Sequence, residues 1–146
     1  MSVPYGVGAG PGNLNPVKSF LKFKAGASIT KGNLVSISTS ADDGYTVVVT
    51  DGDALTTCVP IGVAAETAAS GAWFDVQVGG FCDYMTAATS VAAGDLLISG
   101  TLAGTAYGVD LTDLATSAAL HATIFGQALA DDDSGVLLAA LIFNKF

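Results

Sequence analysis

Charge is the property that this sequence has least of. Charged residues make up 12% of its 146 residues, about half of the usual quarter. Arginine is absent, and five lysines stand against 13 acidic residues, which gives a net charge of −8. A generic nucleic-acid-binding protein needs a basic face and favours arginine for phosphate and base contacts, so the composition excludes that class.

The apolar composition, in contrast, excludes disorder. Hydrophobic residues make up 51% of the chain and the mean hydropathy is +0.57, more than a disordered chain carries. A chain of this length fits one domain, which buries roughly 68–70% of its unfolded surface. Five basic and 13 acidic side chains are few to cover the remainder. We therefore expect other protein chains to cover part of this surface.

Long hydrophobic runs are also missing. The longest uninterrupted one is Val136–Phe143, eight residues, whereas a helix needs about 20 residues to cross a bilayer. The N-terminus has no charged segment followed by an apolar core, so we predict no signal peptide. We accordingly expect a protein that makes no membrane contact.

Side chains that carry catalysis are equally scarce. His121 is the only histidine, Glu66 is the only glutamate and has no obvious partner, and Cys58 and Cys82 lack a metal-ligand spacing. Zinc sites need clustered Cys and His, and the Gly-x-Ser-x-Gly elbow of serine hydrolases does not occur. We predict that the protein is not an enzyme and binds no cofactor or metal. The two cysteines are expected to be reduced, partly buried thiols.

Two acidic segments leave an alternative open. Asp131–Asp133, and Asp51 together with Asp53, present the carboxylates that Ca²⁺ prefers, but neither segment matches an EF-hand loop. Adjacent aspartates before Ser-Gly are typical of a solvated hairpin turn. We favour the turn over the cation site.

Residues 1–16 differ in composition from the rest. Alternating glycines and three prolines fill this stretch, and both residue types oppose helix and central strand. The glycines fit no phosphate-binding loop, because neither a preceding strand nor a Lys-Ser/Thr pair accompanies them. We predict an extended arm over residues 1–16, ordered only against a partner, and a single β domain over residues 17–146.

The remaining chain shows β-strand patterns, and we predict an all-β fold, a small barrel or sandwich. Short segments rich in β-branched, aromatic or apolar residues alternate with Gly, Asn and Asp turns; they are Val35–Ser38, Tyr45–Val49, Trp73–Val78, Leu96–Ile98 and Val136–Phe143. One segment has helical spacing, with Asp110 as the candidate N-cap and Leu111, Leu114, Ala118 and His121 on one face.

The β segments also repeat at a nearly constant offset. Ile29–Val35 matches Val91–Leu97, which aligns Gly32 with Gly94. Ile61–Ala64 matches Phe125–Ala128 at a slightly longer offset, which Gly71–Val78 and Gly135–Ile142 share. We predict two related β units, at residues 27–80 and 89–146, within one domain, because one such unit can hardly bury its own apolar face.

The lysines gather next to the arm. Four of the five lie at positions 18, 22, 24 and 31, directly after it. A basic, armed edge on an acidic body suits docking on an acidic protein surface. The alternative is a solvated strand edge whose lysines discourage edge-to-edge pairing.

A specific order of motifs begins at Ala27. Ala-Ser-Ile-x-x-Gly-Asn-Leu-Val spans Ala27–Val35, Pro-Ile-Gly-Val-Ala follows at Pro60–Ala64, and Ala-Ala-Ser-Gly at Ala68–Gly71 leads into Phe74–Gly80. With the small size, the Gly/Pro arm and the β body, this order resembles the capsid decoration (cement) proteins of tailed bacteriophages. The resemblance covers about residues 17–100 directly and the remainder through the repeat.

The resemblance implies a non-enzymatic virion protein on the outer capsid surface, synthesised in the host cytoplasm. Such proteins are commonly trimers that bridge neighbouring major capsid proteins, and three sites per trimer would add avidity. The arm could add a strand to a capsid sheet or lie across a neighbouring subunit. The candidate capsid-binding residues are Pro4, Tyr5, Pro11, Asn13, Pro16, Lys18, Lys22, Lys24 and Lys31.

Two other classes compete with this interpretation. A phage or bacterial surface or fibre module would bind glycans, with Trp73, Tyr84 and Tyr107 as an exposed aromatic platform. Trp73 adjoins Phe74 in a predicted strand, which favours core or interface packing instead. A small β-barrel enzyme is the least favoured class.

Overall fold

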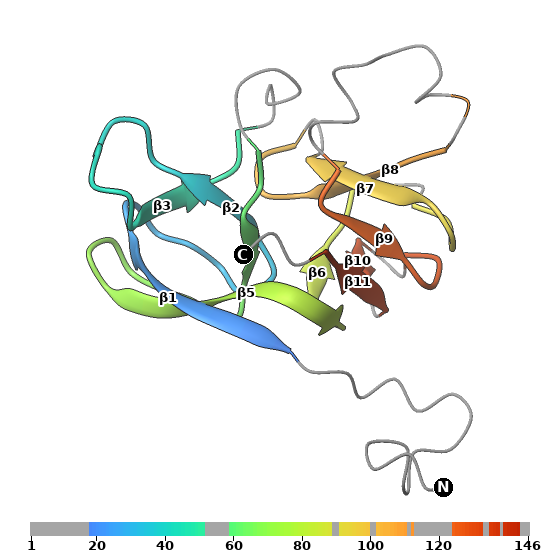
Figure 1. Cartoon of the computed structure of the whole chain (residues 1–146), viewed down its shortest axis with the longest axis horizontal. Helices are drawn as coiled ribbons and strands as arrows, with labels where there is room; N and C mark the ends of the chain where they lie inside the picture. The colour runs from blue at the N-terminus through green and yellow to red at the C-terminus, as the bar shows by residue number, and fades with distance from the viewer. Residues whose placement is uncertain are drawn as a thin grey trace, which may run out of the picture.

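The computed structural model of the chain describes residues 18–51, 59–88, 91–99, 102–110, 112, 124–132, 135–137 and 139–143. The regular elements within them are eleven strands (Figure 1). Their bounds are β1 (Ser19–Ala25), β2 (Leu34–Ile37), β3 (Thr46–Val49), β4 (Gly62–Ala64), β5 (Trp73–Cys82), β6 (Met85–Thr86), β7 (Leu96–Ser99), β8 (Ala106–Val109), β9 (Gly126–Ala128), β10 (Val136–Leu137) and β11 (Ala140–Ile142). No helix among the described residues is long and apolar enough to span a membrane.

The first five strands form a closed five-stranded barrel, the first barrel. β3, β2, β4 and β5 follow one another through antiparallel pairings. β1 closes the ring because it pairs in parallel with β3 and antiparallel with β5. The parallel pairing is short and joins Lys24 to Thr46 and Ala25 to Val47, whereas six residue pairs join β1 to β5. Closure leaves only short edges for pairing with other chains.

The second barrel repeats this plan. β8, β7, β9 and β11 follow one another through antiparallel pairings, and β11 also pairs with the C-terminal end of β5. The parallel bridge between Ala87 and Ala106 closes the ring next to the short β6–β10 pair. Residues 80–87 thus take the place that β1 has in the first barrel. β5 belongs to both barrels, which lie side by side in Figure 1.

The repeat extends to single hydrogen bonds. Asn33 Oδ1 accepts a bond from the Thr30 N–H at 3.0 Å, and Asp95 Oδ2 accepts the equivalent bond from the Ala92 N–H at 2.9 Å. Gly32 N–H donates to Ala64 O in one turn and Gly94 N–H to Ala128 O in the other. Both glycines have φ of +93°, a conformation that only glycine adopts readily. The two turns that the repeat aligns therefore share their hydrogen bonds and backbone conformation.

Close strand approach at two equivalent glycines supports the same conclusion. A Cβ atom on Gly62 would lie 2.3 Å from Gln77 O, and one on Gly126 would lie 2.4 Å from Leu141 O. Both glycines occupy the Gly-x-Ala strand of their unit, β4 or β9. The repeated glycine is thus a packing requirement of each barrel.

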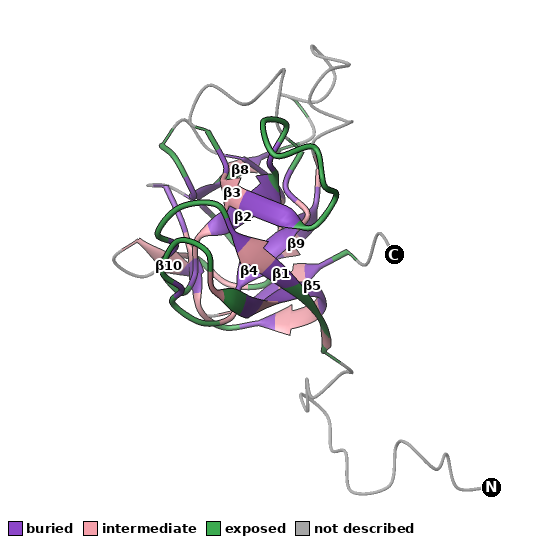
Figure 2. Ribbon diagram, turned by 90° about the vertical axis from the view of Figure 1, so that its left-hand side faces the viewer, coloured by how far each residue is buried: buried purple, intermediate pink, exposed green. Residues whose placement is uncertain are grey.

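The barrels do not have independent cores. One cluster fills the first barrel with Phe23, Val35, Val47, Phe74 and Val76 among its members, and another fills the second with Met85, Leu97, Phe125 and Leu137. Leu34 and Val63 lie on strands of the first barrel but are buried in the second cluster. Successive strand residues face opposite sides, so β2 and β4 contribute to both cores, and Figure 2 draws most of β2 as buried. One unit therefore does leave part of its apolar face for the other to cover.

Most predicted strands are confirmed with shifts of a few residues, and one prediction is wrong. Val136–Phe143 is not one buried strand, because β10 ends at Leu137 and β11 begins at Ala140. The chain changes partner between them, from β6 to β5 and β9. The predicted arm over residues 1–16 and most of the candidate helix lie outside the described residues. Within that helix, Asp110 Oδ1 does accept the Thr112 N–H at 2.8 Å, as an N-cap would.

Candidate functional site

Three of the four clustered lysines lie on or next to β1. Lys22 and Lys24 point outward from the barrel, because Phe23 and Ala25 between and after them are buried in its core. Lys18 precedes the strand, where the chain comes from the arm. Lys31 lies on the turn before β2. The lysines are thus distributed along one strand and the turn that follows it.

Lys24 lies beside an exposed aromatic pair. Register places Lys24 opposite Trp73 on β5, and its N–H donates to Tyr45 O at 2.9 Å. The Tyr45 and Trp73 rings stack with centroids 5.4 Å apart, although Trp73 remains 56% exposed. We call Lys22, Lys24, Tyr45 and Trp73 the basic-aromatic patch. Exposed tryptophan and tyrosine next to cations are typical of protein interfaces.

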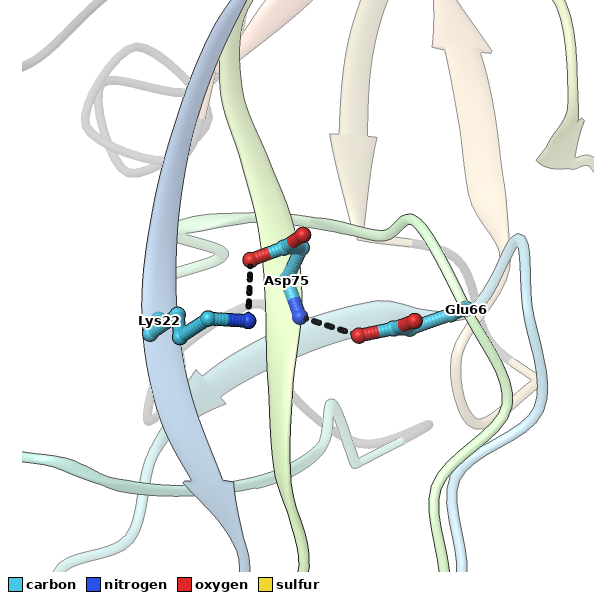
Figure 3. A network of polar contacts seen from close by, with 3 residues as sticks. All are labelled: Lys22, Glu66 and Asp75. Atoms are coloured by element: carbon cyan, nitrogen blue, oxygen red, sulfur yellow. Dashed lines mark hydrogen bonds and ion pairs between the residues drawn. The ribbon is translucent and has the colours of Figure 1, made fainter.

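Lys22 is held by a short polar network (Figure 3). Its Nζ lies 2.9 Å from Asp75 Oδ1, and Glu66 Oε1 accepts the Asp75 N–H at 2.9 Å. The hydrogen bond and charge of Asp75 raise the pKa of Lys22, so the side chain is cationic at neutral pH. Glu66, for which the sequence offered no partner, thus fixes the loop before β5. Lys22 is oriented across the outer face of the first barrel.

The start of β1 has a different character. Lys18 Nζ lies 5.9 Å from the centre of the Phe81 ring, a cation–π distance. Phe20 and Leu21 are 45% and 41% exposed, although neighbouring strand residues face opposite sides. The described residues therefore leave both faces of this end of β1 partly exposed.

Lys31 lies at the junction of the barrels. Its Nζ is 4.9 Å from the centre of the Tyr84 ring, and its N–H donates to Thr67 Oγ1 at 3.1 Å. Lys31 therefore helps to join the two barrels, while Lys22 and Lys24 face away from the first core.

The strand pairing of β1 partly tests the alternative that the lysines protect an exposed strand edge. At Lys24, β1 is bonded to β3 and to β5, so this residue protects no edge. Ser19–Phe23 pair with β5 but not with β3. Lys22 therefore lies on a stretch whose second edge is open among the described strands.

The second barrel carries a hollow of opposite charge. A cavity of about 450 Å³ is lined by Asp95, Leu96, Val109, Asp110 and Gln127, with Gly94 and Thr112. Gln127 Nε2 donates to Gly94 O at 3.1 Å and so fixes its rim. We call this cavity the acidic hollow. It could not be found from the sequence pattern, because Asp95 and Asp110 belong to two separate turns on either side of β7 and β8.

The other titratable groups have structural contacts. Asp131 Oδ1 accepts the Ala93 N–H at 2.8 Å and Asp132 Oδ1 accepts the Val91 N–H at 3.0 Å, so these carboxylates fix the segment before β7. Burial raises the pKa of the Cys82 thiol to about 11. Within the described part of the chain, no three His, Cys, Asp or Glu side chains are grouped as metal ligands. Cys58, His121, Asp53 and Asp133 lie outside it.

The three aromatics proposed as one platform are not together. Trp73 begins β5 and Tyr84 follows its end, which separates them by roughly 30 Å along the strand. Tyr84 is half-buried, with its Oη bonded to Gln77 Oε1, and Tyr107 is on β8. Of the core or interface packing expected for Trp73, the core alternative is wrong, because its side chain points outward beside Lys24.

Comparison with known proteins gives a likeness of fold. No protein-family model matches the chain, and no curated protein sequence is significantly similar to it. The structure is similar to the crystal structure of the head fiber gp8.5 N base in bacteriophage phi29, with a TM-score of 0.58 and 20% identity. The match covers 87% of this chain and 95% of that chain. The chain therefore shares the fold of a bacteriophage head-fibre base.

Proposed function

We propose that this chain is a non-enzymatic structural protein of a bacteriophage virion. It binds the outer surface of the capsid as a homotrimer and stabilises the shell by bridging neighbouring major capsid proteins. It uses no cofactor and contacts neither nucleic acid nor membrane. The observation that carries the proposal is the fold shared with a phage head-fibre base over 87% of the chain.

The distribution of exposed apolar side chains supports a binding role. Phe20, Leu21, Tyr45 and Trp73 are each more than 40% exposed on the first barrel. Clusters of this kind mark interaction surfaces on small soluble proteins. The chain has few charges with which to cover these surfaces, as a protein that is bound on several sides requires.

The capsid contact is assigned to the arm and to the start of β1. The arm residues Pro4, Tyr5, Pro11, Asn13 and Pro16 precede Lys18, Phe20 and Leu21 directly in the chain. An extended arm buries a large area per residue when it lies on a partner, at the cost of its ordering. Lys18 and Lys31 would steer it toward acidic capsid surface.

The test is binding to capsids that lack this protein. Full-length chain, a variant without residues 1–16 and Lys18→Gln are mixed with expanded capsids, and bound protein is measured after pelleting. We expect the truncated variant to keep its β-type circular dichroism and its mass by light scattering, while its capsid affinity falls by about tenfold or more. Asp83→Asn, a change of one exposed charge outside the arm, is the control. If the full-length chain does not bind capsids, the proposal is wrong. If the truncated variant binds as tightly as the full-length chain, the arm does not contribute to capsid binding.

Glycan binding is the second candidate, and one observation favours it. Trp73 is exposed on one side while Tyr45 stacks on the other, which leaves an aromatic face for an apolar sugar face. An oligosaccharide array separates the two functions. Saturable glycan binding that Trp73→Ala abolishes, together with no capsid binding, establishes this second function in place of the first.

A further inference from the structure

Equivalent surfaces on the two barrels differ in what covers them. On the first barrel, a Cβ atom on Gly32 would lie 2.4 Å from Tyr84 O, and the Thr86 N–H donates to Gly32 O at 2.9 Å. Gly94 holds the same turn position in the second barrel, with the same φ of +93°, and would meet nothing within 4 Å. The second barrel covers this turn of the first, whereas none of the described residues covers its own turn.

The uncovered surface continues into the acidic hollow. Leu34 and Val63 are fully buried where the second barrel covers β2 and β4. Their equivalents in the second barrel are Leu96 and Gln127, which line the hollow and are only half-buried. The hollow therefore occupies the place at which the first barrel receives its neighbour.

The repeat also specifies the surface that would fit there. Tyr84 and Thr86 cover Gly32, and the alignment that pairs Gly32 with Gly94 pairs Lys22 and Lys24 with these two residues. Gly104 covers Asn33, since a Cβ atom added to Gly104 would lie only 2.9 Å from Asn33 Nδ2. The glycine at the equivalent place in the first barrel is Gly44, which has a similar φ and would meet nothing within 4 Å. The end of the first barrel that contains Lys22, Lys24 and Gly44 is therefore as uncovered as the hollow.

The residue changes between the two units are complementary in charge. In the first unit, Gly32 and Asn33 are uncharged and follow Lys31, whose Nζ lies over the Tyr84 ring; neutral Tyr84 and Thr86 cover this turn within the chain. The second unit has Asp95 in place of Asn33, and the first unit has Lys22 and Lys24 in place of Tyr84 and Thr86. Asp110 adds a second carboxylate to the hollow. Such pairing across an interface favours one orientation and suppresses others.

Acidic residues also lie at this end of the first barrel: Asp75 pairs with Lys22 Nζ at 2.9 Å, and Asp42 and Asp43 lie on the loop before β3. The Asp43 carboxylate accepts bonds from the Tyr45 and Thr46 N–H groups and from Thr46 Oγ1. Asp42 and Asp43 correspond to Leu102 and Ala103 of the second unit, which are exposed. Like those residues, they would lie outside the contact that Lys22 and Lys24 make.

We propose that the acidic hollow binds the basic-aromatic patch of a second copy of this chain. The copies then associate head to tail. The second barrel of one copy contacts the first barrel of the next copy in the way that the first barrel contacts the second within one chain. Because the two surfaces differ, the contact is heterologous, and it closes into a ring when the rotation between copies allows it. The inference rests on the self-association included in the proposed function and is independent of capsid binding.

Two double variants test the contact in solution without capsids. Asp95→Asn with Asp110→Asn neutralises the hollow, and the turn is retained because Asn33 makes the equivalent bond in the first unit. Lys22→Gln with Lys24→Gln neutralises the patch. Mass is measured by sedimentation equilibrium in low and high salt. We expect an oligomer for the unmodified chain, self-association at least about tenfold weaker for each variant, and the same weakening in about 1 M salt.

Mixing the two variants gives the decisive readout. Each retains one intact surface, so the mixture forms a one-to-one heterodimer while each variant alone is monomeric. Asp83→Asn and Lys18→Gln serve as controls that change the same charges elsewhere and leave assembly unchanged. A monomeric unmodified chain, variants that assemble like it, or a mixture that does not pair would each overturn the proposal.

Discussion

Tyr84 Oη lies 2.5 Å from Gln77 Oε1, and this bond connects residues on either side of the point where β5 passes from one barrel to the other. Gln77 is fully buried, and its Nε2 donates to Gly79 O at 3.1 Å and to Phe81 O at 2.7 Å. All polar atoms of the Gln77 side chain thus have partners. The junction between the barrels is a satisfied polar network within an apolar interior.

Tyr84→Phe is expected to destabilise the protein through this network. The change leaves Gln77 Oε1 buried without a donor, which costs about 1–3 kcal/mol. Urea unfolding followed by tryptophan fluorescence measures the loss, with Tyr107→Phe, at an exposed position of β8, as the matched control. Equal stability of the two variants would contradict a structural role for the bond.

Gly62→Ala and Gly126→Ala are expected to be similarly destabilising. Each introduces a Cβ atom 2.3 or 2.4 Å from a carbonyl oxygen of the neighbouring strand, and overpacking of this kind costs about 1–3 kcal/mol. Gly71→Ala is the control that separates crowding from backbone strain, because Gly71 has φ of +86° but no atom within 4 Å. Thermal unfolding measures all three. The equivalence of the barrels is refuted if only one of the first two variants unfolds early.

Cys82 is expected to make the free energy of unfolding depend on pH in the alkaline range. Burial raises the pKa of its thiol from 9.0 to about 11, so between these values the unfolded chain releases a proton that the folded chain keeps. Unfolding free energy therefore falls as pH rises through this window. The raised pKa values of Tyr84 and Lys22 act in the same direction. We expect Cys82→Ala to reduce the slope of stability against pH, measured by urea unfolding at pH 8 to 11, and an unchanged slope would contradict this.

Trp73→Ala is expected to weaken self-association while changing the stability of the fold only slightly. The side chain is 56% exposed, so its removal changes the unfolding temperature far less than Phe74→Ala, which empties a core position. Self-association weakens, because Trp73 belongs to the basic-aromatic patch. Parallel measurements of unfolding temperature and sedimentation check both statements. A variant that unfolds as early as Phe74→Ala contradicts the first, and one that assembles normally contradicts the second.

The internal repeat was the most informative feature of the sequence. Its nearly constant offset aligned Gly32 with Gly94 and Gly62 with Gly126, and the members of each pair have similar backbone geometry or similar close contacts. β1 was not among the predicted strands, because Lys22 and Lys24 were interpreted as a charge cluster. The alternation of these lysines with Phe23 and Ala25 was the available signal, since it places one face in the core.

The surfaces were less predictable than the strands. Local pattern does not report which segments meet in space, so neither the acidic hollow nor the Tyr45–Trp73 stack followed from the sequence. Of the core or interface packing expected for Trp73, the core alternative was wrong for the same reason. Trp73 begins a strand whose next residue, Phe74, is fully buried, and alternation then directs the tryptophan outward. The sequence showed that four lysines cluster after the arm. It did not show that they are divided between the patch, the start of β1 and the junction with Tyr84.

The six residue pairs between β1 and β5 also determine how the fold bears mechanical load. A pull on the chain before Ser19, directed along β1, would strain these backbone bonds together in shear, whereas a perpendicular pull would open them one after another. Because β5 continues into the second barrel, a sheared load passes into both barrels at once. A tether attached at this point therefore resists tension along one axis far better than peeling across it.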